Sequence, residues 1–508
     1  MQYRSDAKRD LRQIADALGV ANVLEGTVRR EGNHVRVSTE LVDPRNYNTI
    51  WADSYDRDLT DIFAIQSEIA QAVASRLSAQ LSPEERKDIE EKPTNNLEAY
   101  DLYLRAKHLL VATTGVVLLT REREDYSKAI SLLEEAIHKD PKFALAYCMI
   151  AKANDTLYFD RIDHTRERRA LGDVAVKAAL QLRSNLPEVN LALASHLYTC
   201  YRDFERAHHI IYIAAETLPN NSDLLELNAL IDRVQGRWEK STAGLERAVT
   251  LDPRNPGRLA ALSDNYWSLR RYRDYERILD RLIELVPEQP LFPAYRAETA
   301  FAERGDLKGV LAKLGGLPSS VKDDVQVSWQ RVFYSACARD FALANEIVAK
   351  SPREEMMFFG ALVPRQIVQL WLELVEGNHP TMEEFGAARE QLSRKVNADR
   401  SDPFLMAALA FTDVALGSTD EGIKEGLWAL ETRQISEDAV DGPLVAAYVA
   451  AVDAWANQSD FAFEQLNILV KRPSFWFCYG DLKTSPNWDP LRKDPRFDKL
   501  LAELAPRD

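Results

Sequence analysis

The sequence has little glycine and proline for its length. These residues number 20 and 22 among 508, which leaves little room for many tight turns and favours a helical protein. A chain of this length is also too long for one compact core. We therefore expect two or more domains or an extended repeat array.

Cysteine is scarce as well. The four cysteines are Cys148, Cys200, Cys337 and Cys478. They are far apart and form no CxxC pair, so neither a disulfide framework nor a CxxC metal site is indicated. We interpret them as free thiols packed in helices, because free cysteine behaves as a small hydrophobic residue.

The sequence shows no segment for membrane insertion or export. The longest apolar stretches, near Leu109–Thr120 and Leu444–Val452, are shorter than the roughly 20 residues that span a bilayer. The polar start of the chain is not followed by the apolar region of a signal peptide. We expect no membrane insertion and a cytoplasmic location for the chain as given. A periplasmic location is the alternative if a membrane anchor precedes Met1.

Motifs of common enzymes are also absent. The sequence contains no GxSxG, GxxxxGKS/T or HExxH motif, so we predict that the protein is not an enzyme and uses no cofactor. Lys and Arg number 64 against 79 Asp and Glu, which gives a net charge of −15. A duplex-binding surface must neutralise phosphates with basic side chains, so nucleic acid is not expected as a partner.

The first 82 residues indicate a small α+β module. Leu11, Ile14, Ala15 and Leu18 form one helical stripe, and Gly19 is a suitable stop. Further elements are then expected, namely strands at Asn22–Arg30, His34–Val42 and Thr49–Tyr55 and a helix at Leu59–Leu81. In the second strand, Val35, Val37, Thr39 and Leu41 alternate with polar residues, which predicts a half-buried hairpin. Residues 83–96 are charged and contain helix-breaking prolines, so they form a linker.

From Leu97 onward the apolar residues follow a helical period, and a longer period is superimposed on it. Pro219, Pro253 and Pro287 recur at a constant interval of about 34 residues, and each ends an amphipathic helix. Gly236 is expected to turn the chain between the two helices of one repeat. Small residues recur at matching offsets between the prolines, where they let paired helices approach closely.

This pattern resembles the tetratricopeptide repeat (TPR), most clearly over Asp223–Pro253 and Asn255–Pro287. The resemblance implies a mainly α protein, with a TPR-type solenoid over 97–320 and degenerate TPR-like helices over 321–472. The helices expected in the second range are Val321–Lys350, Ala361–Glu376, Thr381–Asn397, Pro403–Leu416 and Pro443–Leu469.

The end of the chain, residues 473–508, is rich in aromatic residues and punctuated by proline. The last repeat of a solenoid exposes an apolar face that must be covered. We interpret the segment as a cap, and a peptide-binding patch is the alternative.

The opening module resembles the second half of the TolB-like amino-terminal domain. The resemblance is carried by LRQIADALGV at 11–20, VLEGTVRR at 23–30, IWADSYDR at 50–57 and DIFAIQ at 61–66. Bacterial proteins of that family join the domain to TPR arrays, and longer relatives carry a cyclase, kinase or winged-helix domain upstream. The resemblance implies that the first part of the domain is missing before Met1.

One group of residues invites a metal-site interpretation. His196 and Cys200 are four residues apart on an expected helix, a spacing that can direct two ligands at one ion. His208 and His209 on the next helix are adjacent, so at most one of them could join. We interpret the group as surface histidines and a packed thiol, and we predict no metal site.

The first helix of each repeat is expected to line a concave face that binds a partner. The residues on that face are Lys152, Asp155, His196, Thr199, Leu230, Arg233, Asp264, Trp267, Glu298 and Phe301. Aromatic side chains beside charges suit an extended or helical peptide. The alternative is that Trp267 and Phe301 pack between repeats.

Together these patterns predict a non-catalytic scaffold that binds a peptide or a partner protein on the concave TPR surface. The alternative is the sensory or regulatory half of a larger bacterial signalling protein whose output domain lies outside this chain. A stand-alone enzyme would need a pocket with converging polar groups. The oligomeric state is left open by the sequence.

Overall fold

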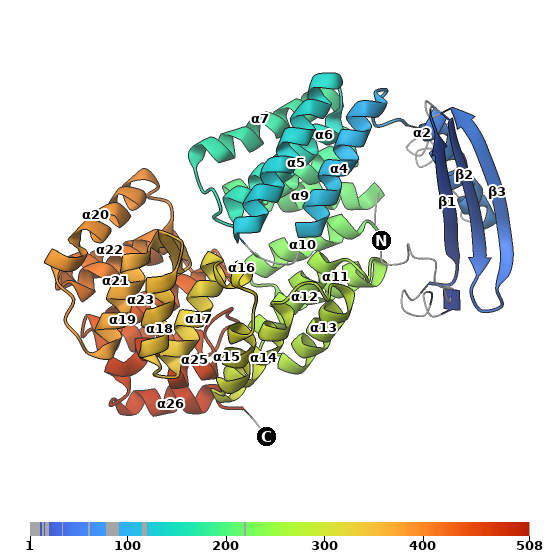
Figure 1. Cartoon of the computed structure of the whole chain (residues 1–508). Coiled ribbons are helices and arrows are strands. Elements are labelled where there is room, and N and C mark those ends of the chain that lie inside the picture. Colours follow the sequence, from blue (N-terminus) through green and yellow to red (C-terminus); the bar gives the residue numbers. More distant parts are fainter. Residues whose placement is uncertain are drawn as a thin grey trace. The chain divides into compact units, whose positions relative to one another are not determined.

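The computed structural model describes residues 11, 12, 15, 20–32, 34–58, 61–77, 91–113, 119–217 and 220–506. The chain divides into two compact units (Figure 1), residues 1–104 with 133–146 and residues 105–132 with 147–508. We describe each unit by itself. Among the positions discussed above, Ile14, Leu18, Gly19 and Pro219 lie outside the described residues, as do the ends of the Leu59–Leu81 helix and most of the linker.

The smaller unit contains an antiparallel three-stranded sheet in the order β1-β2-β3. Its elements are β1 (Val23–Glu31), β2 (His34–Asp43), β3 (Asn48–Asp58) and α2 (Ile62–Arg76). The alternation predicted for the second strand is confirmed, because Val35, Val37, Thr39 and Leu41 are all buried. Their apolar side chains pack with Trp51, Tyr55 and Ile65, so α2 covers one face of the sheet.

Two longer helices, α4 (Leu97–Thr113) and α5 (Leu119–Lys139), contribute residues to both units. Within the smaller unit, Phe63 of α2 meets Tyr100 of α4 edge to face, with ring centres 4.8 Å apart. Asn96 also donates a hydrogen bond to the Lys139 carbonyl oxygen at 3.2 Å. These contacts fix the start of α4 and the end of α5 within the smaller unit.

The larger unit consists of helix pairs joined by short turns (Figure 1). The first pairs are α6 (Ala144–Phe159) with α7 (Arg166–Arg183), α8 (Pro187–His196) with α9 (Phe204–Thr217), α10 (Ser222–Val234) with α11 (Trp238–Leu251), α12 (Pro256–Ser268) with α13 (Tyr272–Leu285), α14 (Phe292–Arg304) with α15 (Lys308–Gly315), and α17 (Val325–Cys337) with α18 (Phe341–Lys350). A π-helical turn, η2 (Leu197–Tyr201), extends α8, and a short helix, α16 (Ser319–Lys322), precedes α17.

The second half of this unit begins with a small hairpin and continues with further pairs. Its elements are β4 (Glu355–Phe358), β5 (Ala361–Pro364), α19 (Arg365–Glu376), α20 (Met382–Ala398), α21 (Pro403–Ala415), α22 (Thr419–Thr432), α23 (Asp441–Trp455), α24 (Ser459–Leu469), α25 (Tyr479–Thr484), the 3₁₀ turn η3 (Pro486–Leu491) and α26 (Pro495–Leu504). The structure therefore shows the expected helical solenoid of TPR-like hairpins with a small α+β module before it.

Local signals explain where many of these helices begin. The Asn221 and Asn255 side chains accept hydrogen bonds from backbone N–H groups in the first turns of α10 and α12. Thr381 forms a reciprocal capping box with Glu384 at the start of α20. The small residues expected at the helix crossings are buried, namely Ala129, Ala136, Ala207, Ala214, Ser241 and Ala248.

Three expected helices need correction. The Val321–Lys350 and Pro443–Leu469 helices are wrong as single helices, because the chain turns at Arg339 and Asn457, which have positive φ angles. The start of the Ala361–Glu376 helix is also wrong. Residues Ala361–Pro364 form β5, which pairs with β4, and proline is unfavourable inside a helix.

A left-handed residue separates the two helices of each pair for much of the chain. These residues are Arg161, Arg202, Gly236, Arg270, Gly305, Arg339, Gly377, Gly417 and Asn457. From Arg202 to Arg339 they follow one another at a nearly constant interval of about 34 residues, the length of one TPR unit. From Arg339 to Asn457 the intervals are longer. The repeat thus continues past residue 300 with longer units, and Gly236 turns the chain as predicted.

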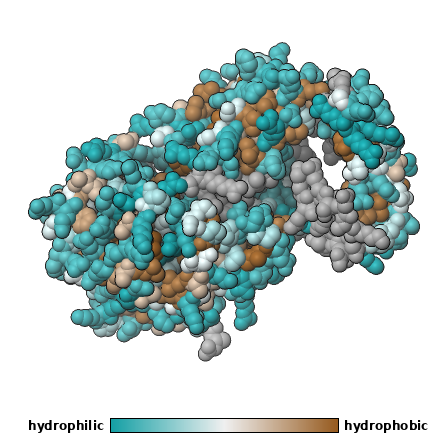
Figure 2. Space-filling view, in the orientation of Figure 1, coloured by the Kyte–Doolittle hydropathy of each residue, from teal (hydrophilic) through white to brown (hydrophobic). Residues whose placement is uncertain are grey.

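Among the described helices, none combines the length and the apolar character required to cross a membrane. The face drawn in Figure 2 is mainly hydrophilic, with hydrophobic residues in separate areas.

Candidate functional site

The turn arginines, which we define as Arg161, Arg202, Arg270 and Arg339, contact the C-terminal half of the larger unit. Each has a positive φ angle, a conformation that costs an L-residue about 1–2 kcal/mol. The contacts of their side chains explain why arginine occupies these turns.

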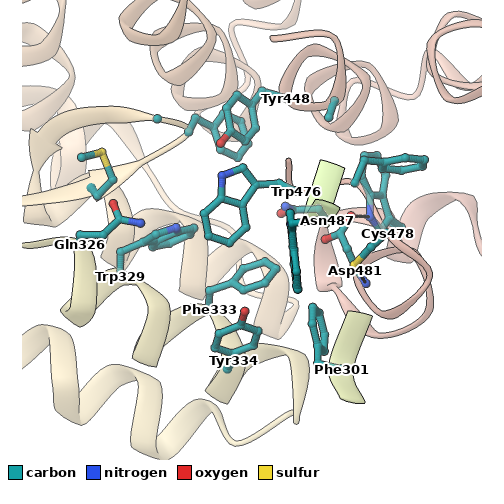
Figure 3. Close-up of a pocket in the computed structure, with 17 residues that line it drawn as sticks. Phe301, Gln326, Trp329, Phe333, Tyr334, Tyr448, Trp476, Cys478, Asp481 and Asn487 are labelled. Atoms are coloured by element: carbon teal, nitrogen blue, oxygen red, sulfur yellow. Dashed lines mark hydrogen bonds between the residues drawn. The ribbon is translucent and has the colours of Figure 1, made fainter. Parts of the chain in front are cut away.

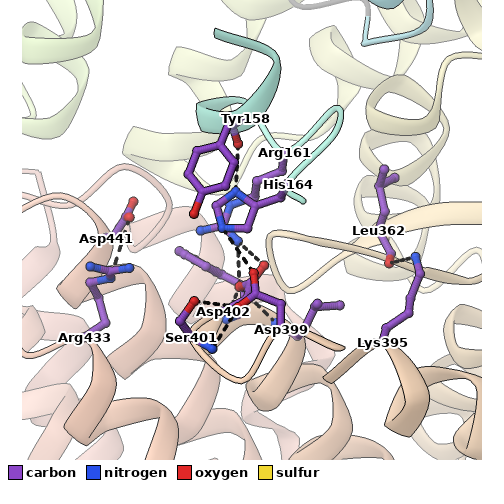
Figure 4. A network of polar contacts seen from close by, with 12 residues as sticks. Tyr158, Arg161, His164, Leu362, Lys395, Asp399, Ser401, Asp402, Arg433 and Asp441 are labelled. Carbon is purple, nitrogen blue, oxygen red and sulfur yellow. Dashed lines mark hydrogen bonds and ion pairs between the residues drawn. The ribbon is translucent and has the colours of Figure 1, made fainter. Parts of the chain in front are cut away.

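Two turn arginines form ion pairs with aspartates at or just before the starts of later helices. Arg161 donates from Nη1 to both carboxylate oxygens of Asp402 at 2.6 Å. Arg202 pairs with Asp438 and Asp441. Figure 4 shows Arg161 and the neighbouring His164 facing Asp402 and Asp399.

The other two turn arginines bind the segment near the C-terminus. Arg270 donates to the carbonyl oxygens of Leu469 and Phe477, each at 3.4 Å. Arg339 donates to both carboxylate oxygens of Asp489 at 2.6 and 2.7 Å. The four arginines therefore attach the ends of the first helices to helix ends and turns 150 to 241 residues further along the chain.

The closing segment, residues 474–491, packs directly on α12 and α14. The Ser474 N–H donates to the Ser268 carbonyl oxygen at 3.1 Å, and the Trp267 indole N–H donates to the Phe475 carbonyl oxygen. A Cβ atom on Gly480 would lie only 1.9 Å from the Phe301 carbonyl oxygen. The chain's own segment thus covers the part of the expected partner surface that contains Trp267 and Phe301.

The structure places the ten expected partner-binding residues in different environments. Asp155, His196, Trp267, Glu298 and Phe301 are buried, Thr199, Leu230, Arg233 and Asp264 are half-buried, and Lys152 is exposed. Trp267 and Phe301 are brought together, because both line one pocket. Asp155 and His196 lie together in a separate cluster with Cys200. Arg233 Nη1 lies 3.7 Å from Asp264 Oδ2.

That pocket has a volume of about 190 Å³ and an aromatic lining. Its walls come from α12, α14, α17, the β4–β5 turn, α23 and the closing segment. The lining residues are Trp267, Phe301, Gln326, Trp329, Phe333, Tyr334, Met357, Phe359, Gly360, Ala447, Tyr448, Trp476, Phe477, Cys478, Asp481, Asn487 and Trp488. In Figure 3, the side chains of Trp329, Phe333 and Trp476 lie beside one another in this pocket.

The ten residues expected from the sequence to bind a partner did not include the pocket residues on α17, the β4–β5 hairpin, α23 and the closing segment. Gln326, Trp329, Phe333 and Tyr334 lie on one face of α17 at helical spacing, a signal that equally predicts a core face. The Phe-Trp-Phe run of the closing segment was the stronger signal, and its interpretation as a peptide-binding patch was the alternative to a cap.

Polar groups at the pocket are few. Burial raises the pKa of Asp481 to about 7, although the Trp488 indole donates a hydrogen bond to this carboxyl group at 3.0 Å. Asn487 accepts a hydrogen bond from Trp371 at 2.8 Å. With one titratable carboxyl group and amides against many aromatic rings, the pocket suits recognition of an apolar group.

A titratable group lies near the pocket on α14. Burial raises the pKa of Glu298 from 4.5 to about 8, and hydrogen bonding with Tyr334 opposes the shift. The folded protein therefore retains a proton that the unfolded chain releases between these pH values, so stability declines as the pH rises from 4.5 to 8. The described structure provides no hydrogen-bond partner for Glu298 Oε1.

Glu298→Gln should remove this pH dependence, because glutamine resembles the neutral carboxyl group. We expect similar melting temperatures for the variant and the wild type at pH 5. At pH 8 the variant should be more stable by about 3 kcal/mol. Thermal unfolding at the two pH values measures the difference, and parallel pH profiles would contradict the assignment of a protonated Glu298.

The histidines considered for a metal site separate in the structure. His196 and Cys200 lie together with Asp155, and their ligand atoms are all within 4.8 Å of one another. His208 is half-buried and His209 is exposed on α9, and neither belongs to this group. The interpretation of His196 as a surface histidine is wrong, because its side chain is buried, whereas Cys200 is a packed thiol as expected. The third group, Asp155, comes from α6 rather than from the next helix.

Comparisons with known proteins give limited matches. No protein-family model matches the chain. Part of the chain is 30% identical over 142 residues to "Putative adenylate cyclase 3" of Rhizobium meliloti (strain 1021), a match that covers 28% of this chain and 23% of that protein. The chain therefore spans less than a quarter of that relative's length.

Several solved structures share a general likeness with the chain. Human IFIT1, as a dimer with PPP-AAAA, has a TM-score of 0.42 and 14% identity, covering 73% of this chain and 79% of that chain. A tetratricopeptide repeat protein from Parabacteroides merdae has a TM-score of 0.32 and 14% identity, covering 50% and 93%. Yeast Tom70 has a TM-score of 0.30 and 15% identity, covering 72% and 66%. All three TM-scores are below 0.5, so these similarities establish no function.

Proposed function

We propose that the chain is a non-catalytic binding module that holds a segment of a partner protein by inserting an apolar or aromatic side chain into the aromatic pocket. The observation that supports this proposal is the partial exposure of the large aromatic side chains that line the pocket. Trp329, Phe333, Tyr448 and Trp476 are only half-buried, although each is a large aromatic residue. Contacts with a partner would remove their remaining surface from water, which is favourable.

The size of the pocket supports a side chain as its occupant. A dry cavity of about 150 Å³ holds one benzene molecule, and this pocket measures about 190 Å³. Complete small-molecule sites usually measure about 300–1,000 Å³. One aromatic or branched aliphatic side chain matches the volume, and the rest of the partner segment would lie outside the pocket. Aromatic anchors in such pockets dominate many protein interfaces.

The proposed binding surface differs from the concave face expected from the sequence. Trp267 and Phe301, two of the residues expected on the concave face, contribute to the pocket wall as buried residues. The half-buried groups available to a partner are those of α17, α23 and the closing segment.

A selection with random peptides tests the proposal. The full chain is immobilised and a phage-displayed peptide library is selected against it. The affinity of a selected synthetic peptide is then measured for the wild type and for Trp476→Ala. We expect peptides with a shared aromatic or aliphatic anchor, and about 30-fold weaker binding to the variant, the loss of roughly 2 kcal/mol that marks an interface hot spot.

Two further variants separate the pocket from the rest of the surface. Ala447→Leu adds bulk to the pocket wall without removing an aromatic ring, and it should also weaken binding. Phe461→Ala is the matched control, because Phe461 is an exposed aromatic residue (56%) of α24 and does not line the pocket. Failure to select any peptide, or equal affinity of all variants, would refute the proposal.

A second candidate function is favoured by the partial match to the Rhizobium meliloti protein. In this proposal the chain is the sensory or regulatory part of a larger signalling protein, and the opening module is part of a TolB-like domain. The printed name of that relative contains adenylate cyclase, but the match covers only 23% of its length. The proposal requires a chain extending beyond Met1, which sequencing the native transcript would reveal.

A further inference from the structure

A buried cluster of oxygen, nitrogen and sulfur donors lies within the larger unit, away from the aromatic pocket. Asp155 comes from α6, His196 ends α8, and Cys200 lies in the π-helical turn η2. The His196 Nδ1 atom is 2.8 Å from Asp155 Oδ1, and Cys200 Sγ is 3.3 Å from the same oxygen. All three residues are at least 95% buried.

The backbone around the cluster is shaped to bring these groups together. The π-helical turn Leu197–Tyr201 widens the helix at Cys200 and ends at the left-handed Arg202, and such turns are frequent at functional sites. On α7, a Cβ atom at Gly172 would lie 2.5 Å from Asp155 Oδ1. Any larger residue at position 172 would therefore displace Asp155 from the cluster.

The hydrogen bonds of the cluster leave one acceptor unused. Asp155 Oδ1 accepts from both His196 and Cys200, whereas the described structure provides no hydrogen-bond partner for Asp155 Oδ2. A buried carboxylate oxygen without a partner is unfavourable. A packed thiol and an ordinary histidine do not account for this oxygen, whereas a cation bound by the carboxylate does.

The other nitrogen of His196 has its own carboxylate. His196 Nε2 lies 3.0 Å from Asp173 Oδ1, which also accepts a hydrogen bond from the Tyr201 hydroxyl group at 2.7 Å. A carboxylate that binds the outer nitrogen of a metal-ligating histidine fixes its orientation and tautomer. This arrangement presents Nδ1 to the side of Asp155 and Cys200.

We propose that Asp155, His196 and Cys200 bind a zinc ion and that Asp173 is a positioning residue for His196. Carboxylate, imidazole and thiolate are all zinc ligands, and a thiolate disfavours magnesium and calcium. Zinc–ligand bonds of about 2.0–2.3 Å place neighbouring donors about 3.3–3.6 Å apart in a tetrahedral site. The distances of His196 Nδ1 and Cys200 Sγ from Asp155 Oδ1, 2.8 and 3.3 Å, are close to these values, and all three donor atoms lie within 4.8 Å of one another.

The charges of the cluster balance in the bound state. Zinc binding releases the proton from Cys200 Sγ and the proton shared between His196 Nδ1 and Asp155, because ligands bind in their deprotonated forms. One carboxylate and one thiolate then neutralise the ion, so no net charge is buried at the three ligands. In the metal-free cluster the same groups are held together by hydrogen bonds.

Metal titration of the full, metal-free chain tests the site. Cobalt(II) serves as a spectroscopic probe, because a thiolate ligand produces a charge-transfer absorption band, and zinc(II) is then added to displace it. We expect one equivalent of zinc to abolish the cobalt band. Zinc should also raise the melting temperature of the wild type, because it binds the folded state selectively.

Variants identify the ligands. Cys200→Ala should lose the cobalt band and the zinc-dependent rise in melting temperature. The matched control, Cys337→Ala, removes another buried thiol and should retain both responses. Asp173→Asn should weaken zinc binding about 10–100-fold while the thiolate band at saturating cobalt persists. No cobalt band in the wild type, or an unchanged band in Cys200→Ala, would overturn the proposal.

Discussion

Arg161→Gly is expected to destabilise the larger unit by about 3 kcal/mol, although glycine is the more favourable residue for the left-handed turn. Glycine would relieve about 1 kcal/mol of backbone strain. The substitution would also remove the guanidinium group that pairs with Asp402, whose side chain is only 4% exposed. Breaking a buried ion pair by removing one partner costs about 3–5 kcal/mol, because the other charge remains buried.

The loss of stability caused by Arg161→Gly should be concentrated at the start of α21. Asp402 accepts hydrogen bonds from the Phe404 and Leu405 N–H groups and so caps this helix, and the Arg161 guanidinium lies 4.0 Å from the Phe404 ring centre. We expect a lower melting temperature and faster hydrogen–deuterium exchange in the first turn of α21. Exchange is the sharper measurement, because repeat proteins can unfold in parts.

Asn457→Gly provides the matched control for Arg161→Gly. Asn457 also has a positive φ angle, 60°, and turns the chain between α23 and α24. Glycine at this turn should be neutral or stabilise the protein by a few tenths of a kcal/mol. If both substitutions had the same small effect, the Arg161 side chain would not attach α21 to the end of α6.

Gly480→Ala is expected to detach α25 from α14 and to destabilise the protein by about 3 kcal/mol, the upper part of the range for overpacking. The added Cβ atom would lie 1.9 Å from the Phe301 carbonyl oxygen and 2.7 Å from its carbon. Both atoms belong to the helix backbone, which cannot move aside as a flexible side chain can. The closing segment must therefore shift.

A shift of the closing segment would open the aromatic pocket, because Trp476, Phe477 and Cys478 form part of its wall. Tryptophan fluorescence should move to longer wavelength and become easier to quench, together with a lower melting temperature. Gly315→Ala is the matched control. Outside the adjoining residues and the helix's own backbone, no described atom lies within 4 Å of the added Cβ atom at Gly315 in α15, so this change should stabilise by up to about 1 kcal/mol. Equal effects of the two substitutions would contradict the close packing of α25 on α14.

The sequence determined the parts of the fold that depend on nearby residues. Side-chain alternation predicted the burial of Val35, Val37 and Leu41 in β2, and the proline spacing predicted helix pairs that recur at a constant interval. These signals arise from contacts within one hairpin or one repeat, so they are visible as short periods. The hairpin of β4 and β5 was missed, because Ala361–Pro364 is a short apolar run that is equally compatible with a helix.

The contacts between distant segments were decided by the tertiary structure alone. Arg161 and Asp402 are 241 residues apart, and nothing in the period of the repeat relates one to the other. The aromatic pocket likewise combines α12 with the closing segment, and the donor cluster combines Asp155 with Cys200, 45 residues further along the chain. The sequence by itself therefore determined a helical repeat protein with an α+β module. Which of its side chains meet depended on the packing of loops far apart in the chain, because no local periodicity encodes such contacts.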